Sequence, residues 1–213
     1  MHKPKLIVFS SGTKTSGGSG FENLVKASRS GVLDAEIVGV VSNHENGGVR
    51  EKADRLGIPF TYFPGPWTAE NYQALTRNSN FVALSGWLKL VTGLDPRTTF
   101  NIHPGPLPRF GGAGMYGHHV HEAVMEAYRR GEVIESAVSM HFVTEKYDEG
   151  PLFLSAPVKI LPDDTPETLG ARVNRMEHLY QPVVTNHILK KRIRWNGMDP
   201  KSLVTISFKD ILN

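Results

Sequence analysis

Two hydrogen-bonding side chains, Asn101 and His103, stand where a short apolar run stops in a proline-rich loop. In an extended strand, side chains two residues apart point to the same face, so the carboxamide and the imidazole would project together. Pro104, Pro106 and Pro108 have a fixed φ and no backbone N–H, so they end strand pairing and lead the loop away. We therefore expect a pair of donors at an open strand end, where parallel α/β sheets bind their ligands. A simple strand cap is the alternative interpretation.

A glycine-rich loop at residues 10–20 follows the first apolar run, residues 6–9. It nearly spells a phosphate-binding Walker A motif, but Gly18 stands where the lysine belongs, and no G-x-G-x-x-G is completed. Triphosphate and dinucleotide sites are therefore disfavoured. Gly18, Ser19 and Gly20 open an expected helix whose free N–H groups and positive dipole end would hold one phosphate. A flexible turn is the alternative.

A row of large, mostly apolar residues follows the expected strand at residues 81–84. The row consists of Trp87, Leu88, Lys89, Leu90 and Val91. Such a row is usually part of a core, but beside the Asn101 strand it could equally form the wall of a pocket for a flat aromatic ligand.

His118 and His121 are three residues apart at the start of an expected helix, so they could share a face with the spacing of metal ligands. No carboxylate or cysteine completes a recognisable metal motif beside them. We therefore expect no metal site.

Apolar runs and helical patterns alternate along the first hundred residues, which predicts βα units on a mostly parallel sheet with helices on both faces. The later strand places Ser139 and His141 on one face. Thr165 and Pro166 favour the start of a long helix. We expect strands at 6–9, 35–42, 58–63, 81–84, 134–144, 152–160 and 203–208, and helices at 49–56, 69–77 and 165–190 and from about 21 and 118 onward. The fold class is therefore α/β, Rossmann-like, in one domain with a tail.

Composition narrows the function classes further. The 213 residues include no cysteine, which excludes disulfides, thiolate zinc sites and cysteine nucleophiles. The net charge of +3 is spread along the chain apart from one cluster at residues 190–194, so no nucleic-acid partner is expected. No apolar run approaches the roughly 18 residues of a membrane span, and no signal peptide is recognised, so we expect a cytoplasmic protein without a membrane partner.

The glycine-rich loop, the Asn101–Pro108 stretch and residues 139–151 together resemble the folate-dependent formyltransferases, in the right order, over about residues 5–190. The resemblance implies a formyltransferase fold over residues 1–213, with a nucleotide-binding half (1–100), a catalytic and folate-binding half (101–190) and a tail (191–213). It implies that Asn101, His103 and Asp148 are catalytic and that Glu177 contacts the ribose or amine of the substrate. It also assigns phosphate binding to Gly18, Ser19 and Gly20, and folate binding to Trp87, Leu88, Lys89, Leu90 and Val91.

The activity that this resemblance implies is transfer of a formyl group from 10-formyltetrahydrofolate, as co-substrate, to the amine of glycinamide ribonucleotide. Asn101 and a protonated His103 would donate to the oxyanion of a tetrahedral intermediate, and the Asp148 carboxylate would raise the pKa of His103. The partners would be small molecules only, for a monomer or homodimer.

Two departures from the family keep other activities open. Residues 13–17 lengthen the first loop, and Lys89 and Trp87 stand where Arg and Phe are usual. The alternatives are a formyltransferase for another amine, such as a sugar-amine nucleotide, a formyltetrahydrofolate hydrolase and, least favoured, a non-catalytic nucleotide- or folate-binding module.

Overall fold

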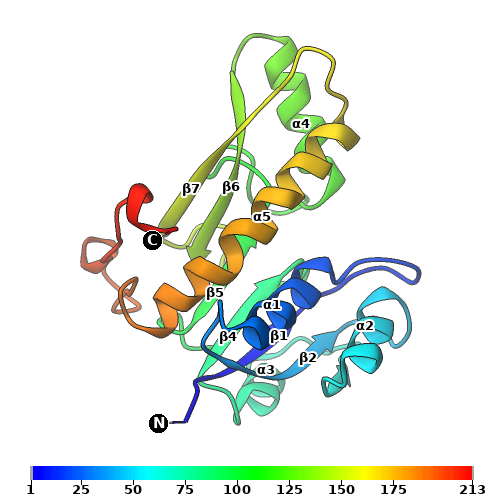
Figure 1. Cartoon of the computed structure of the whole chain (residues 1–213), viewed down its shortest axis with the longest axis vertical. Helices are drawn as coiled ribbons and strands as arrows, with labels where there is room; N and C mark the ends of the chain where they lie inside the picture. Colours follow the sequence, from blue (N-terminus) through cyan, green and yellow to red (C-terminus); the bar gives the residue numbers. More distant parts are fainter. Residues whose placement is uncertain (1, 213) are drawn as a thin grey trace.

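One seven-stranded sheet organises the computed structural model, which describes residues 2–212 (Figure 1). The spatial order is β3-β2-β1-β4-β5-β6-β7. The first five strands are parallel, whereas β6 runs antiparallel to β5, and β7 antiparallel to β6. The strands are β1 (Lys5–Phe9), β2 (Glu36–Ser42), β3 (Phe60–Tyr62), β4 (Phe81–Ser85), β5 (Thr99–His103), β6 (Glu135–Phe142) and β7 (Leu152–Lys159). The predicted Rossmann-like α/β fold is confirmed.

Helices cover both faces of this sheet because its central strands alternate their side chains between two apolar cores. Leu6 and Val8 of β1 pack on one face, and Ile7 and Phe9 pack on the other. The helices are α1 (Ser19–Ser30), α2 (Gly48–Leu56), α3 (Ala69–Thr76), α4 (His118–Arg129) and α5 (Pro166–Leu189). The first core includes side chains of α1, α2, α4 and α5, and the second includes Tyr72 of α3.

The long helix α5 lies beside α1 across one face of the sheet (Figure 1). It begins as its sequence predicts, with a reciprocal capping box between Thr165 and Thr168 and with Pro166 in the first turn. The ion pair between Asp164 and Arg172, with 2.5 Å between Oδ2 and Nη1, fixes the same end. This helix carries Glu177 toward the start of α1.

The strand expected at residues 203–208 does not form, and that prediction is wrong. Val204 pairs with Arg194 in one isolated antiparallel bridge, and the rest of this stretch includes the short 3₁₀ helix η2 (Phe208–Asp210), after η1 (Pro200–Ser202). The Phe208 ring packs against α5, with its centroid 5.7 Å from that of Tyr180. Leu203 and Ile206 pack against the core while Val204 and Phe208 stay exposed, and no further strand forms beside β7 within residues 2–212.

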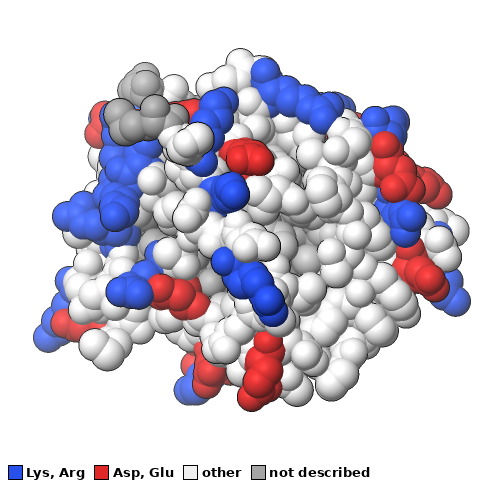
Figure 2. Space-filling model, turned by 90° about the horizontal axis from the view of Figure 1, so that it is seen from below, with Lys and Arg blue, Asp and Glu red and all other residues white. Residues whose placement is uncertain are grey.

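No helix among residues 2–212 is long and apolar enough to cross a membrane. On the face shown in Figure 2, acidic and basic side chains both lie mainly around the rim, Lys and Arg gather at one side, and much of the middle is uncharged. The charge on that face is mixed, in keeping with the small net charge.

Candidate active site

A cavity of about 730 Å³ opens at the carboxyl ends of β4 and β5, beside the start of α1. Every site residue expected from the sequence borders it. They are Gly18, Ser19, Gly20, Trp87, Leu88, Lys89, Leu90, Val91, Asn101, His103, Asp148 and Glu177. The fold thus brings together side chains from both halves of the chain at the edge of the sheet where α/β proteins bind ligands.

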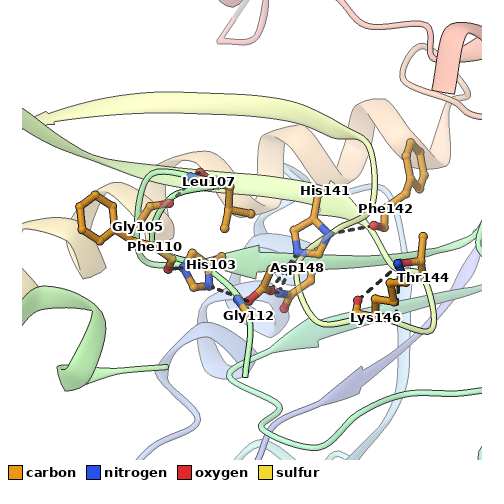
Figure 3. Close-up of polar contacts among 12 residues, drawn as sticks. His103, Gly105, Leu107, Phe110, Gly112, His141, Phe142, Thr144, Lys146 and Asp148 are labelled. Atoms are coloured by element: carbon orange, nitrogen blue, oxygen red, sulfur yellow. Dashed lines mark hydrogen bonds and ion pairs between the residues drawn. The ribbon is translucent and has the colours of Figure 1, made fainter. Parts of the chain in front are cut away.

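His103 is almost fully buried, and its ring is held by a backbone carbonyl (Figure 3). Nε2 lies 2.7 Å from the oxygen of Phe110. A carbonyl only accepts, so we assign the ring proton to Nε2. The other nitrogen, Nδ1, faces the Asp148 carboxylate with 3.7 Å to Oδ2. The imidazole therefore presents an unprotonated nitrogen to the carboxylate.

Burial lowers the pKa of His103 below its ordinary value, although the Asp148 charge and the Phe110 carbonyl act in the opposite direction. The sequence reasoning expected Asp148 to raise this pKa. The carboxylate does act in that direction, but the net shift of the pKa is downward, because the cost of placing a cation at a buried site exceeds the attraction of the carboxylate. Burial therefore favours the neutral imidazole over the imidazolium at His103.

Asp148 is positioned by an unusual backbone and by a loop amide. Its φ of 55° lies in the left-handed region, and Gly112 N–H donates to its Oδ2 at 3.0 Å. Burial alone would raise the pKa of Asp148, but its contacts with the His141 and His103 rings and the hydrogen bond from the Gly112 amide together lower it below its ordinary value. The carboxylate is thus ionised at neutral pH.

His141 completes this group, and sequence reasoning assigned it no role. Strand pairing sets it directly opposite Asn101, whose Nδ2 lies 3.1 Å from His141 Nε2 and 3.3 Å from Asp148 Oδ1. His141 Nδ1 donates to the Phe142 carbonyl at 2.8 Å, which leaves Nε2 to accept from Asn101. In Figure 3, His103 and His141 both point toward Asp148. The period-two pattern placed His141 on a polar face, but its register against β5 is a long-range property.

The start of α1 offers unpaired backbone donors to the cavity. Gly18, the N-cap, has a left-handed φ of 74° and no capping side chain. The first backbone bond of this helix runs from Glu22 N–H to Gly18 O, so the earlier first-turn amides, including those of Ser19 and Gly20, have no helical partner. The longer loop before it folds on itself, because the Ser16 N–H donates to Thr13 Oγ1 at 2.9 Å. This helix end can hold an anion.

Gly18→Ala should weaken binding of the phosphorylated substrate selectively. A Cβ at Gly18 would lie 3.1 Å from Val49 Cγ2 and would be strained at φ +74°, so the helix start must shift. We expect the KM for the nucleotide to rise about 10-fold, corresponding to about 1.4 kcal/mol, with the folate KM unchanged. Gly31→Ala is the matched control, since it adds similar left-handed strain at the other end of α1 in open space. An equal rise in both KM values would show that the phosphate does not bind at Gly18–Gly20.

Trp87 belongs to both the core and the cavity wall. The two interpretations of residues 87–91, as part of the core and as a pocket wall, are therefore both correct for Trp87. Its side chain is 7% exposed, its ring centroid lies 5.3 Å from that of Phe9, and its Nε1 donates to Tyr72 Oη at 3.1 Å. Lys89 Nζ sits 4.4 Å above the Trp67 ring. The rim of this wall therefore carries a cation over an otherwise apolar surface.

Glu177 is half-buried and borders the cavity. Burial raises its pKa to about 7, although Asn174 Nδ2 donates to Oε2 at 3.1 Å and opposes the shift. A carboxyl group with this pKa changes charge near neutral pH. It can therefore accept from a ribose hydroxyl or share a proton with it.

Glu177→Gln should stabilise the free protein at high pH. The folded-state pKa of about 7 exceeds the ordinary value of 4.5, so the folded wild type binds the proton more tightly and loses stability as pH rises through that window. Gln removes this loss, so the variant should gain up to about 3 kcal/mol over the wild type at pH 8. Urea unfolding at pH 4 and pH 8 measures it. A stability difference that is the same at both pH values would show that Glu177 titrates normally.

His118 and His121 do not converge on a common ligand. His118 is half exposed and lies 3.3 Å from Glu122, whereas His121 is buried, which lowers its pKa to about 4. Among residues 2–212, no group of three or more His, Cys, Asp or Glu side chains could hold a metal ion. The absence of a metal from the native protein stays a prediction.

Comparison with known proteins identifies relatives over most of the chain. Residues 4–185 match the family model described as "Formyl transferase". A relative from Arabidopsis thaliana, named "Phosphoribosylglycinamide formyltransferase, chloroplastic", is 36% identical over 91% of this chain and 69% of its own length. One from Bacillus subtilis (strain 168), named "Phosphoribosylglycinamide formyltransferase", is 29% identical over 87% of this chain and 94% of its own.

A solved structure shares the fold at similar coverage. It is a glycinamide ribonucleotide transformylase from Symbiobacterium toebii, which superimposes with a TM-score of 0.76 at 28% identity, covering 92% of each chain.

Proposed function

The chain belongs to the formyl transferase family, and from that premise we propose that it transfers a formyl group from 10-formyltetrahydrofolate to the primary amine of glycinamide ribonucleotide. The observation that carries the proposal is that one cavity combines three features. It has unpaired amides at the start of α1, an apolar wall at residues 87–91, and the polar group of Asn101, His103 and Asp148. These suit a phosphorylated amine, a flat aromatic carrier and an acyl transfer.

In this proposal the two substrates lie along different walls of the cavity. The phosphate of the nucleotide binds at Gly18–Gly20, and the ribose lies against Glu177, which α5 carries to the same side. The pterin ring of the folate lies against the Trp87 wall. The amine and the formyl carbon then meet beside Asn101 and His103, and this fixed orientation provides part of the rate acceleration.

The chemical step needs donors for an oxyanion and a route for one proton. The amine nitrogen attacks the formyl carbon, and Asn101 Nδ2 turns the N–H that faces Asp148 Oδ1 toward the oxygen as it becomes negative. Neutral His103 takes the proton of the attacking nitrogen at Nδ1, and the Asp148 carboxylate stabilises the imidazolium that results. The proton then passes to the leaving nitrogen of the folate, and the bond from that nitrogen to the formyl carbon breaks. No covalent enzyme intermediate is required.

The rival activities differ in what receives the formyl group. We propose an assay with 10-formyltetrahydrofolate and glycinamide ribonucleotide, run beside a sugar-amine nucleotide and beside water alone. We expect kcat/KM for glycinamide ribonucleotide to exceed that for the sugar-amine nucleotide by more than about 10-fold. Formate release that proceeds equally fast without any amine would identify a hydrolase instead. Tight binding of both substrates without turnover would support a binding module.

Cellular location and assembly also belong to the proposal. One relative named above is chloroplastic and another is bacterial, so a cytoplasmic location stays a prediction, which cell fractionation tests. A monomer or homodimer without nucleic-acid or membrane partners also stays a prediction, and light scattering of the purified protein tests its assembly.

A further inference from the structure

Gln181 is a buried polar side chain in the wall of the same cavity, and the proposed reaction leaves it without a role. The residue lies on α5 and is 1% exposed. Its Oε1 accepts from Ser85 Oγ at 3.3 Å. Its Nε2 has no hydrogen-bond partner among residues 2–212. Because an unpaired buried donor is costly, its presence beside a cavity indicates that a ligand supplies the missing acceptor.

The surroundings of Gln181 place its carboxamide beside the first turn of α1. A Cβ added to Gly20 would lie 2.2 Å from Ser85 Oγ and 3.1 Å from Gln181 Oε1. The first turn of α1, the end of β4 and the middle of α5 therefore meet at one point. Because Ser85 Oγ donates to Oε1, the free group of this carboxamide is the donor Nε2.

We propose that Gln181 is a phosphate-binding residue, whose Nε2 donates to the phosphate held by the amides of Gly18, Ser19 and Gly20. This inference rests on the proposed function and extends its nucleotide site. A neutral amide adds a donor to the unpaired amides without placing another charge beside Glu177. Glu177 lies one turn earlier on the same face of α5 and borders the same cavity. Helix α5 would thus contact the phosphate through Gln181 and the ribose through Glu177, with the two side chains one turn apart.

Such an arrangement makes Gln181 a determinant of specificity. The donor gains a strong, charge-assisted acceptor from a phosphate monoester and remains unpaired with an amine that lacks the phosphate. The site should therefore reject the unphosphorylated glycinamide riboside more strongly with Gln181 than without it.

Thr185 provides a matched control on the same helix. It is also fully buried with an unpaired polar atom, Oγ1, but it does not border the cavity. If unpaired groups on α5 are only imperfections of packing, Gln181→Met and Thr185→Val should behave alike. If Gln181 binds phosphate, only its replacement should affect binding.

The test measures binding of inorganic phosphate by calorimetry, together with both KM values and the melting temperature. For Gln181→Met we expect about 10-fold weaker phosphate binding and a similar rise in the nucleotide KM. The folate KM and the melting temperature should stay close to those of the wild type. Gln181→Met leaves the Ser85 hydroxyl without its acceptor, Gln181 Oε1. The double variant Ser85→Ala, Gln181→Met removes that hydroxyl as well, and it should show the same loss of phosphate binding. Thr185→Val should bind phosphate like the wild type.

Three results would overturn the inference. They are unchanged phosphate affinity in both Gln181 variants, the same loss in Thr185→Val, or no phosphate binding by the wild type. The calorimetry does not depend on turnover. A wild type that binds phosphate through Gln181 but does not formylate glycinamide ribonucleotide would therefore contradict the proposed function and leave the inference intact.

Discussion

His103→Ala is expected to lower kcat by roughly 10²–10³-fold with little change in either KM, the loss typical of one preorganised group that acts in the transition state. The ring is held by Phe110 O and presents Nδ1 to Asp148, so its removal takes away the proton acceptor without touching the phosphate or pterin walls. Asn101→Ala should give a loss of similar size, because we propose its Nδ2 as the donor to the oxyanion. Steady-state kinetics with each substrate varied in turn measures both.

His187→Ala is the control for this prediction. His187 is also buried, with Nε2 donating to the Ile211 carbonyl at 3.1 Å, but it lies outside the cavity wall. Its loss should reduce stability and leave kcat unchanged. An equal fall of kcat in the two variants would indicate a general effect of removing a buried histidine, and the assigned role of His103 would fail.

Asp148→Asn should lower kcat by roughly 10²-fold and move the acidic limb of the pH–rate profile to lower pH. The direction follows from the pKa of His103, which burial already lowers and which the Asp148 charge partly restores. Without that charge the pKa falls further, so Nδ1 stays unprotonated to a lower pH. Titration of the His103 ring by NMR should show the same shift.

A double variant distinguishes cooperation from independent action. Asp148→Asn combined with His103→Ala should cost much less than the product of the two single losses, since residues that act as one unit are not additive. Asp164→Asn breaks the ion pair with Arg172 and should lower stability without moving the acidic limb. Fully multiplicative losses would mean that Asp148 acts apart from His103, for instance by ordering the loop through Gly112 N–H.

Much of the fold followed from local patterns, because they are properties of neighbouring residues. Continuous apolar runs predicted the buried parallel strands, and the Thr165 and Pro166 signals located the start of α5 within one residue. The tail misled the same reasoning, since residues 203–208 form one isolated bridge to Arg194 and place the Phe208 ring against Tyr180 of α5. A period of two does not by itself identify the partner that a segment packs against.

The site shows the same division between local and long-range information. Asn101 and His103 could be predicted because their spacing along one strand fixes their common direction. His141 could not, because it meets Asn101 only through the register of β6 against β5. The net pKa direction of His103 and the unpaired nitrogen of Gln181 likewise depend on burial produced by distant segments.

The most direct test of the account follows the formyl carbon itself. The wild type is mixed with glycinamide ribonucleotide and 10-formyltetrahydrofolate labelled at the formyl carbon, and the products are examined by NMR in a single turnover. We expect the label in a formamide on the nucleotide amine, and we expect it to remain on the folate over the same time with His103→Ala. Label released as formate, with the amine of glycinamide ribonucleotide unchanged, would contradict the account.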